Sequence, residues 1–272
     1  MKKINLKNFW ILFIIILISS GCKKDMQTKE EQPKNIKVIC EDTVFPMVND
    51  LVRDYNFNND PVVTVESFDR EVAFNKLNNS EADILIGYGK PNIKEIETEM
   101  LAFDGIGIIV NISNKVNGLG IEQLKKIYTG KILNWEKLKG QSNTINPVAF
   151  KRDLNSIQQL FDSNIMDTPV KEQMNSSIQY ASSIEEMKNF VAQNKNAIGF
   201  IPGQWYNKES VFLKLSGIEL TSSNLKNKLY PLRFPVLMYY TKDKKDSLKD
   251  LFQYFKSEDS KKVIRKFCIE AF

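Results

Sequence analysis

Short apolar segments alternate with amphipathic helical segments along the chain from Ile36 onward, and this alternation constrains the fold more than any other feature. Ile36 to Cys40 and Val62 to Val65 have the length and composition of strands. Pro46 opens a helix between them, in which apolar residues recur at i, i+3, i+4 and i+7. Ala82 to Ile86 is a third strand, after a helical segment at residues 71–77. Strands separated by helices at this spacing predict right-handed βαβ units and a parallel sheet.

A second α/β group follows a buried strand at Ile106 to Val110. The chain then returns to the first group through a late strand, Val236 to Tyr240, and ends in a helical stretch from Ser247. Ligands of open α/β sheets bind at the carboxyl ends of the strands, so two facing lobes would form a cleft that closes on its ligand. Within the second group the pattern predicts strands at Ile145 to Phe150 and Ala197 to Ile201, and helices near Ile121, Asn155 and Ile184.

The N-terminal residues predict a secretory signal. Three lysines precede the apolar run Phe9 to Ile18, which is much shorter than the ~20 residues of a membrane-spanning helix. Ser19-Ser20-Gly21-Cys22 resembles a bacterial lipobox, in which Cys22 is lipidated and becomes the mature N-terminus, although Ser19 stands where leucine is usual. We therefore expect a lipoprotein signal peptide at residues 1–21 and a flexible tether at residues 22–34. An ordinary cleaved signal or a short anchor helix is the alternative.

Charge and composition exclude several classes of function. The chain has 38 basic and 33 acidic residues, a net charge of +5. Loss of the leader with its three lysines lowers this to about +2, which is too balanced to predict nucleic-acid binding. The absence of histidine excludes Ser-His-Asp and Cys-His catalysis and His-ligated metal sites. Cys40 and Cys268 lack metal-site spacing and could form either a disulfide or two buried thiols. We predict no metal and no cofactor.

Two stretches carry a specific resemblance to a known family. Phe103 to Asn111, FDGIGIIVN, resembles the "DGIAVVVN" strand of phosphate-type solute-binding proteins. Ile121 to Trp135, IEQLKKIYTGKILNW, is similar to their "LTxEQLxxIFTGKIxNW". In this stretch Gly130 would end a helix, and Trp135 would support the second lobe without touching ligand. Shorter matches agree at Ala197 to Phe200, at Tyr230 to Leu232, and at Phe252 to Phe267, which resembles the closing helix of the family.

By these residues the chain resembles the phosphate-binding (PstS-like) subunits of bacterial ABC importers. The resemblance implies an α/β, type II periplasmic-binding-protein fold, with two α/β lobes and a ligand cleft between them. The first lobe would comprise residues 35–110 and 233–272, and the second residues 111–232. The resemblance also implies a monomeric carrier that binds inorganic phosphate or another oxyanion and delivers it to an ABC permease. Its lipid anchor would hold it on a membrane, facing the periplasm or the exterior.

The junction after the first strand, Cys40-Glu41-Asp42-Thr43, is the first part of a candidate anion site. The helix that follows offers unpaired N–H groups and partial positive charge, which suit an oxyanion. The family binds phosphate here through the hydroxyl and N–H of a threonine, and Thr43 matches that residue by position. A helix N-cap at Asp42 or Thr43 is the alternative interpretation.

The junction from Arg152 to Gln158 is the second part of the candidate site. The family pattern here is Arg, three residues, then Ser-Gly-Thr, and Arg152 and Ser156 keep this spacing. Arg152 would bind two oxygens in bidentate fashion, and Ser156 would donate its hydroxyl and N–H. Asn155 and Gln158 are further candidates at this junction. Ser67, which matches the family's Gly-Ser-Gly turn, is the candidate at the end of the second strand.

Several family residues are missing. Ile157 replaces a glycine and Gln158 a threonine, and only Ser67 remains of the Gly-Ser-Gly turn. Gly87-Tyr88 replaces a pair that in some members holds an acid, which accepts the proton of hydrogen phosphate and so favours phosphate over sulfate. The residues that could substitute for this acid are Asp42, Glu66 and Asp69.

Three functions compete on the sequence alone. A non-catalytic carrier agrees with the family motifs. A PstS-like envelope lipoprotein with an altered ligand, acting as a sensor or adhesion module, is favoured by the weakened motifs. A secreted hydrolase is opposed by the missing histidines and the lack of Gly-x-Ser-x-Gly, although a carboxylate pair for glycoside hydrolysis is formally available. We favour the carrier and expect no enzyme activity.

Overall fold

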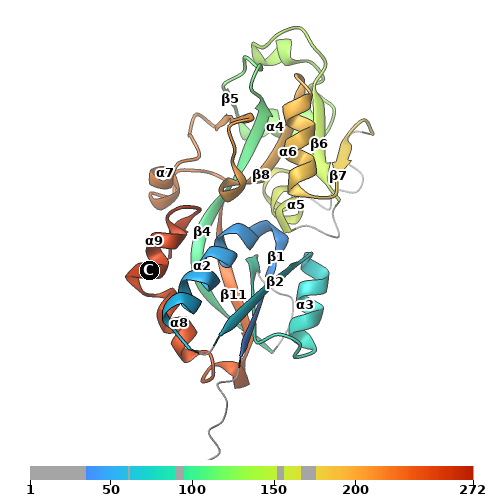
Figure 1. Ribbon diagram of the computed structural model, residues 1–272. Helices are drawn as coiled ribbons and strands as arrows, with labels where there is room; N and C mark the ends of the chain where they lie inside the picture. Colours follow the sequence, from blue (N-terminus) through green and yellow to red (C-terminus); the bar gives the residue numbers. More distant parts are fainter. Residues whose placement is uncertain (1–34, 61, 90–94, 152–155, 167–175, 272) are drawn as a thin grey trace, which may run out of the picture. The chain divides into compact units, whose positions relative to one another are not determined.

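The computed structural model describes residues 35–60, 62–89, 95–151, 156–166 and 176–271 (Figure 1). The predicted signal peptide, the lipidation site Cys22 and the tether lie outside the described residues, as do Arg152 and Asn155. The helices of the described part of the chain include none that is both long enough and apolar enough to span a bilayer.

The first lobe is built on three parallel strands. They are β1 (Ile36–Glu41), β2 (Val63–Phe68) and β3 (Ile84–Tyr88), with β1 in the middle. Helices α2 (Phe45–Asn58) and α3 (Arg70–Asn78) connect them in turn, as the sequence pattern predicted. Because the strands are parallel and in register, their carboxyl ends meet at one edge of the sheet. The loops into α2 and α3 therefore lie side by side there.

Two long strands join the lobes, and they correct the prediction of a parallel sheet. Strand β4 (Ile96–Asn111) pairs along its first part with β11 (Arg233–Thr241) and along its second part with β8 (Ala197–Pro202). Both pairings are antiparallel, and β11 also lies antiparallel to β3. The reversal follows from the path of the chain, because β4 leaves the first lobe and β11 returns to it (Figure 1).

The second lobe has its own parallel strands. In it β6 (Asn146–Phe150) lies parallel to both β7 (Gln179–Ala181) and β8. Its core is aromatic: the Phe161 ring stacks on Phe200 with centroids 4.0 Å apart, and the Tyr128 hydroxyl donates to the Val148 carbonyl at 3.0 Å. Helices α4 (Ile121–Tyr128), α5 (Ser156–Phe161), α6 (Ile184–Gln193) and α7 (Ser222–Lys226) belong to this lobe. Shorter strands of the described chain are β5 (Gly118–Leu119), β9 (Ser210–Phe212), β10 (Lys214–Leu215) and β12 (Ile269–Glu270).

The motif at Ile121 to Trp135 has the structural role that the sequence predicted. Helix α4 ends at Tyr128, and Gly130 follows with a φ of 74°, a left-handed conformation that glycine adopts without steric cost. Trp135 is buried, and its indole Nε1 donates to the Asn196 carbonyl at 3.1 Å. The indole thereby fixes the turn after α4 to the loop before β8.

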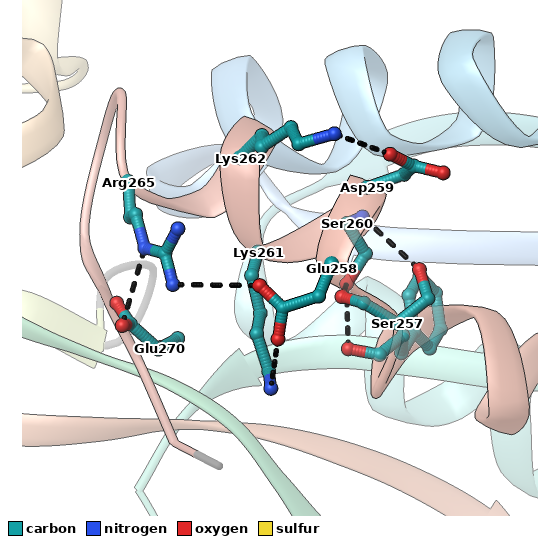
Figure 2. Close-up of polar contacts among 9 residues, drawn as sticks. Ser257, Glu258, Asp259, Ser260, Lys261, Lys262, Arg265 and Glu270 are labelled. Atoms are coloured by element: carbon teal, nitrogen blue, oxygen red, sulfur yellow. Dashed lines mark hydrogen bonds and ion pairs between the residues drawn. The ribbon is translucent and has the colours of Figure 1, made fainter.

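The C-terminal segment forms two helices, α8 (Lys249–Phe255) and α9 (Glu258–Ile264), where the sequence predicted one. Ser257 separates them, because its hydroxyl accepts from the Ser260 N–H at 3.2 Å and caps α9. The buried Ser260 hydroxyl in turn donates to the Phe255 carbonyl at 2.6 Å. Figure 2 shows that the charged side chains of this region also pair with one another: Glu258 with Lys261, Asp259 with Lys262, and Arg265 with Glu270.

Cys40 and Cys268 are both free and buried. Of the two alternatives that the sequence left open, the structure therefore has the two buried thiols. Burial raises the pKa of both thiols, so neither has the thiolate character of a reactive cysteine.

Candidate functional site

Strand-to-helix junctions from both lobes line one pocket of about 360 Å³. This volume lies within the range of small-ligand sites, roughly 300–1,000 Å³. The pocket brings together Thr43, Ser67 and Ser156, three residues that the sequence predicted from separate junctions. Its full lining is Glu41, Asp42, Thr43, Phe45, Ser67, Phe68, Asp69, Arg70, Ser156, Ser182, Ser183, Ile184, Glu185 and Trp205.

Thr43 lies in a single 3₁₀ turn, Asp42–Val44, between β1 and α2. It is only 4% exposed, and its hydroxyl oxygen has no hydrogen-bond partner among the described residues. The alternative reading of Asp42 or Thr43 as a helix N-cap is wrong, because Glu41 and Val44 hold the cap positions and neither side chain makes a capping bond. A buried hydroxyl without a partner is costly in a folded protein, and this one belongs to a residue that lines a pocket.

Ser156 is the first residue of α5 and stands on the second-lobe side of the pocket. It is 2% exposed, and its hydroxyl oxygen likewise has no hydrogen-bond partner within the described part of the chain. Ser67 lies near the end of β2, directly beside Cys40 of β1 in the parallel register, and is half-buried. Three hydroxyl-bearing residues from three strand ends therefore line the same pocket.

Gln158 does not line this pocket. Its side chain is fully buried, where it accepts from the Phe150 N–H at 2.8 Å and donates to Asp162 at 2.7 Å. These bonds connect α5 to β6, which is a structural role. Arg152 and Asn155 lie outside the described residues and stay predictions.

Glu41 and Arg70 form an ion pair in the pocket that sequence analysis missed. One Arg70 guanidinium nitrogen lies 2.6 Å from Glu41 Oε1 and 2.6 Å from the Tyr88 carbonyl oxygen. Glu41 is 1% exposed, and burial raises its pKa above the usual value of 4.5, although the positive charge of Arg70 acts against this; the Ser156 hydroxyl lies close enough to Glu41 to favour its charged form without meeting the geometry of a hydrogen bond. The second oxygen of Glu41 is buried and has no hydrogen-bond partner in the described chain.

The Glu41 carboxylate occupies the space beside Gly87. A Cβ placed on Gly87 would lie 2.4 Å from Glu41 Oε1, so any other residue at position 87 would displace this side chain. Gly87 belongs to the pair that replaces the family's acidic position after the third strand. The buried carboxylate beside this position thus comes from the adjacent strand β1, whereas the candidates Asp42 and Glu66 are exposed and Asp69 is half-buried.

The other acidic side chains of the pocket are placed differently from Glu41. Asp69 caps α3 by accepting from the Val72 N–H at 3.0 Å. Asp42 and Glu185 are exposed, and Glu185 pairs with Lys188 at 3.1 Å. Glu41 is therefore the one buried carboxylate among the lining residues described, and Arg70 is the one arginine among them.

The second lobe contributes a wall that sequence analysis also missed. Ser183 caps α6 by accepting from the Glu186 N–H at 3.1 Å. Trp205, at the end of the turn Gly203–Trp205 that follows β8, donates from its indole Nε1 to the Thr43 carbonyl at 2.7 Å. Glu41 and Arg70, like Thr43, lie where a strand of the first lobe ends and a helix begins, so the strand-end rule could have identified them as candidates. No local sequence signal indicated Trp205.

The described residues contain no group of three or more Cys, Asp or Glu side chains arranged to hold a metal ion. Five lining residues carry hydroxyl groups, of which Thr43 and Ser156 are buried and Ser67 is half-buried. The Arg70 guanidinium is a further donor, and Glu41 supplies a buried acceptor. This set suits a small polar ligand that accepts several hydrogen bonds and donates one.

Comparison with known proteins identifies the family. A family model described as a PBP superfamily domain matches residues 27–259. The phosphate-binding protein PstS of Borreliella burgdorferi is 24% identical over 221 residues, which cover 78% of each chain. These matches bear out the resemblance first seen at Phe103 to Trp135.

Solved structures agree on the fold. An ABC-type phosphate transport receptor from Vibrio cholerae superposes with a TM-score of 0.72 at 26% identity, covering 86% of this chain and 99% of its own. A phosphate ABC transporter substrate-binding protein from Clostridium perfringens, solved with bound phosphate, gives a TM-score of 0.80 at 22% identity and covers 88% and 100% of the two chains. The fold is the two-lobed type II periplasmic-binding-protein fold. These relatives are binding proteins and not enzymes. The chain belongs to the PBP superfamily.

Proposed function

We propose that this protein is a lipid-anchored, extracytoplasmic solute-binding protein that binds inorganic phosphate and delivers it to an ABC permease. The proposed ligand-binding residues are Thr43, Ser67 and Ser156, which line the pocket, together with Arg152 and Asn155; Gln158, the sixth predicted residue, does not line it. The names of the Borreliella and Vibrio relatives support phosphate as the ligand.

The observation that carries this proposal is the pair of buried hydroxyls without partners, Thr43 and Ser156, on opposite walls of one pocket. A hydroxyl can donate to an anion, and hydrogen bonds to a charged group contribute more than those between neutral groups. An oxyanion between the two walls would satisfy both groups at once. Binding would thereby repay the cost of leaving them unpaired in the free protein.

Glu41 gives the pocket a basis for choosing among oxyanions. Its free oxygen can accept a hydrogen bond from a ligand that carries a proton, as phosphate does near neutral pH. Sulfate carries no proton there, so a buried carboxylate would repel it. We therefore expect the pocket to bind phosphate more tightly than sulfate.

Calorimetric titration of the purified protein with phosphate, sulfate and molybdate tests the ligand. We expect saturable binding of phosphate, weak or absent binding of sulfate, and a large loss of phosphate affinity in Arg152→Ala. If none of the three oxyanions binds, the proposal is wrong.

The selectivity of the pocket is tested by Glu41→Gln, with Glu185→Gln as a matched control at an exposed carboxylate of the same pocket. The glutamine can donate to an unprotonated oxygen, so we expect Glu41→Gln to narrow the preference for phosphate over sulfate. Glu185→Gln should leave the preference unchanged. An equal effect of both substitutions would contradict a specific role for Glu41.

The anchor is tested at Cys22. Cells grown with an alkyne-tagged fatty acid should label the wild-type protein, and Cys22→Ser should be unlabelled and released from the membrane fraction. Labelling of Cys22→Ser would contradict the anchor. Phosphate uptake by cells lacking the gene, with and without the wild-type copy, tests delivery to a permease.

The second candidate function is a PstS-like envelope lipoprotein with an altered ligand, acting as a sensor or adhesion module. The acidic lining favours it, because four carboxylates face one arginine among the described pocket residues. Binding of a ligand other than an oxyanion, together with normal phosphate uptake in cells that lack the protein, would support this function.

A further inference from the structure

Trp205 connects the two walls of the pocket. It follows strand β8 of the second lobe, and its indole N–H donates to the main-chain carbonyl of Thr43 at 2.7 Å. Thr43 belongs to the first lobe, between β1 and α2. The two residues are 162 positions apart in the chain, so this bond exists only when the lobes are arranged as they are here.

The surroundings of Trp205 hold its ring in place. The Lys188 ammonium nitrogen lies 5.7 Å from the ring centroid, within the range of a cation–π contact. Lys188 is itself paired with Glu185 at 3.1 Å, so α6 helps to orient the ring. The indole forms part of the pocket lining, next to the residues whose hydroxyls face the ligand space.

We propose that Trp205 is a positioning residue for ligand: it fixes the Thr43 turn through its carbonyl and thereby sets the direction of the Thr43 hydroxyl. This inference rests on the proposed function. A ligand held by Thr43 and Ser156 and the bond from Trp205 to Thr43 require the same arrangement of the lobes. Each therefore stabilises the other, because the coupling between two binding events is reciprocal.

The chain provides a matched control for this indole. Trp135 also donates from Nε1 to a main-chain carbonyl, that of Asn196, at 3.1 Å, and it is buried. Both residues of this bond, Trp135 and Asn196, lie in the second lobe and outside the pocket lining. Trp205→Phe and Trp135→Phe thus remove the same chemical group, but only the first removes a bond between the lobes.

Phosphate binding to the wild type and to both variants tests the inference, by calorimetry for Kd and by stopped-flow mixing for the two rate constants. We expect Trp205→Phe to weaken binding by about threefold to tenfold, as loss of one hydrogen bond predicts. The loss should be in the dissociation rate, because the bond forms once the lobes have met. Trp135→Phe should lower the unfolding midpoint and leave Kd unchanged.

Tryptophan fluorescence gives a readout that a merely structural role would not move. Phosphate should change the emission of the wild type and of Trp135→Phe, and the change should be lost in Trp205→Phe. If Trp205→Phe does not fold, Trp205→Tyr, which keeps a large ring and lacks the indole N–H, is measured for Kd and dissociation rate in its place.

The outcomes separate the two ideas. If the wild type binds phosphate and the Trp205 variant binds it with the same Kd and dissociation rate, the role of Trp205 is wrong and the proposed function stands. If the wild type binds no phosphate, the proposed function is wrong, and so is the inference that rests on it.

Discussion

The pocket and the C-terminal helix α9 differ in whether their polar side chains have hydrogen-bond or ion-pair partners within the protein. Around α9 the polar side chains drawn in Figure 2 are paired with one another or with main-chain groups. In the pocket, buried oxygens of Glu41, Thr43 and Ser156 have no hydrogen-bond partner among the described residues. The helix end thus satisfies its polar groups within the chain, whereas the pocket leaves three buried oxygens without a protein partner, as a binding site would. Unpaired buried groups lower stability, and a binding site accepts that cost for the ligand.

The largest effect on stability is expected from Arg70→Ala. This change leaves the Glu41 carboxylate buried without its counter-charge, which costs about 3–5 kcal/mol in the free energy of unfolding at neutral pH. Burial already raises the pKa of Glu41, so the folded state holds a proton on this group more readily than the unfolded state does. The loss in the free energy of unfolding should therefore shrink as the pH falls through the raised pKa of Glu41, because a protonated carboxyl no longer needs a counter-charge. Urea denaturation of the wild type and Arg70→Ala at several pH values measures this loss.

Arg53 provides the control for Arg70→Ala. It is an exposed arginine that pairs with Asp50 at 2.8 Å on the surface of α2. Arg53→Ala should leave the free energy of unfolding nearly unchanged at every pH, because exposed pairs contribute little. Equal losses in the two variants would show that the Glu41–Arg70 pair is no more important than a surface contact.

Ser156→Ala should separate binding from stability. Removing the hydroxyl deletes a donor to the ligand, and we expect phosphate affinity to fall by about 10-fold to 100-fold. The same change removes an unpartnered buried group, so the thermal midpoint should stay the same or rise. Calorimetric titration and a thermal melt measure the two effects. A fall in both would mean that this hydroxyl stabilises the free protein after all.

Ser260→Ala should show the reverse behaviour at α9. The Ser260 hydroxyl donates to the Phe255 carbonyl, and its loss should cost about 1 kcal/mol in the free energy of unfolding. Phosphate affinity should not change. Measuring phosphate affinity and the free energy of unfolding for Ser156→Ala and Ser260→Ala tests whether the two regions differ as proposed. A loss of phosphate affinity in Ser260→Ala would contradict the proposed difference.

The smallest effect is expected from Lys262→Ala. Lys262 and Asp259 form an exposed pair at 2.8 Å one turn apart on α9, where salt and water screen the attraction. The urea midpoint should shift by less than in Arg70→Ala or Ser260→Ala, and added salt should abolish the shift. A shift as large as that of Ser260→Ala would show that this surface pair matters more than its exposure suggests.

The sequence predicted the parts of the site that follow from local rules. Thr43 and Ser67 stand at the ends of the parallel neighbours β1 and β2, so their meeting followed from the predicted topology. Ser156, after β6 of the second lobe, joins them because the two lobes face one another, as the family resemblance implied. The break at Ser257 could also have been foreseen, because Ser257 is followed by two acidic residues in the pattern of a helix start.

The rest of the site depends on pairs that are distant in sequence. Glu41 and Arg70 are 29 positions apart, and their meeting depends on the side chains that surround them after folding. Trp205 reaches Thr43 only through the arrangement of the lobes. Strand β11 was predicted at Val236 to Tyr240, but its antiparallel direction was missed, because strand periodicity does not record the direction in which the chain returns. The lobe boundaries at 35–110 plus 233–272 and at 111–232 stay a prediction.

The absence of a side chain at Gly87 has an evolutionary consequence. Residue 87 and residue 41 compete for the same space, so a side chain at one position requires a smaller residue at the other. In related chains we expect these two positions to vary together, with the acid on either of two neighbouring strands. A column-by-column alignment would then record a lost carboxylate in this chain, although the buried carboxylate of Glu41 lies beside that position on the adjacent strand.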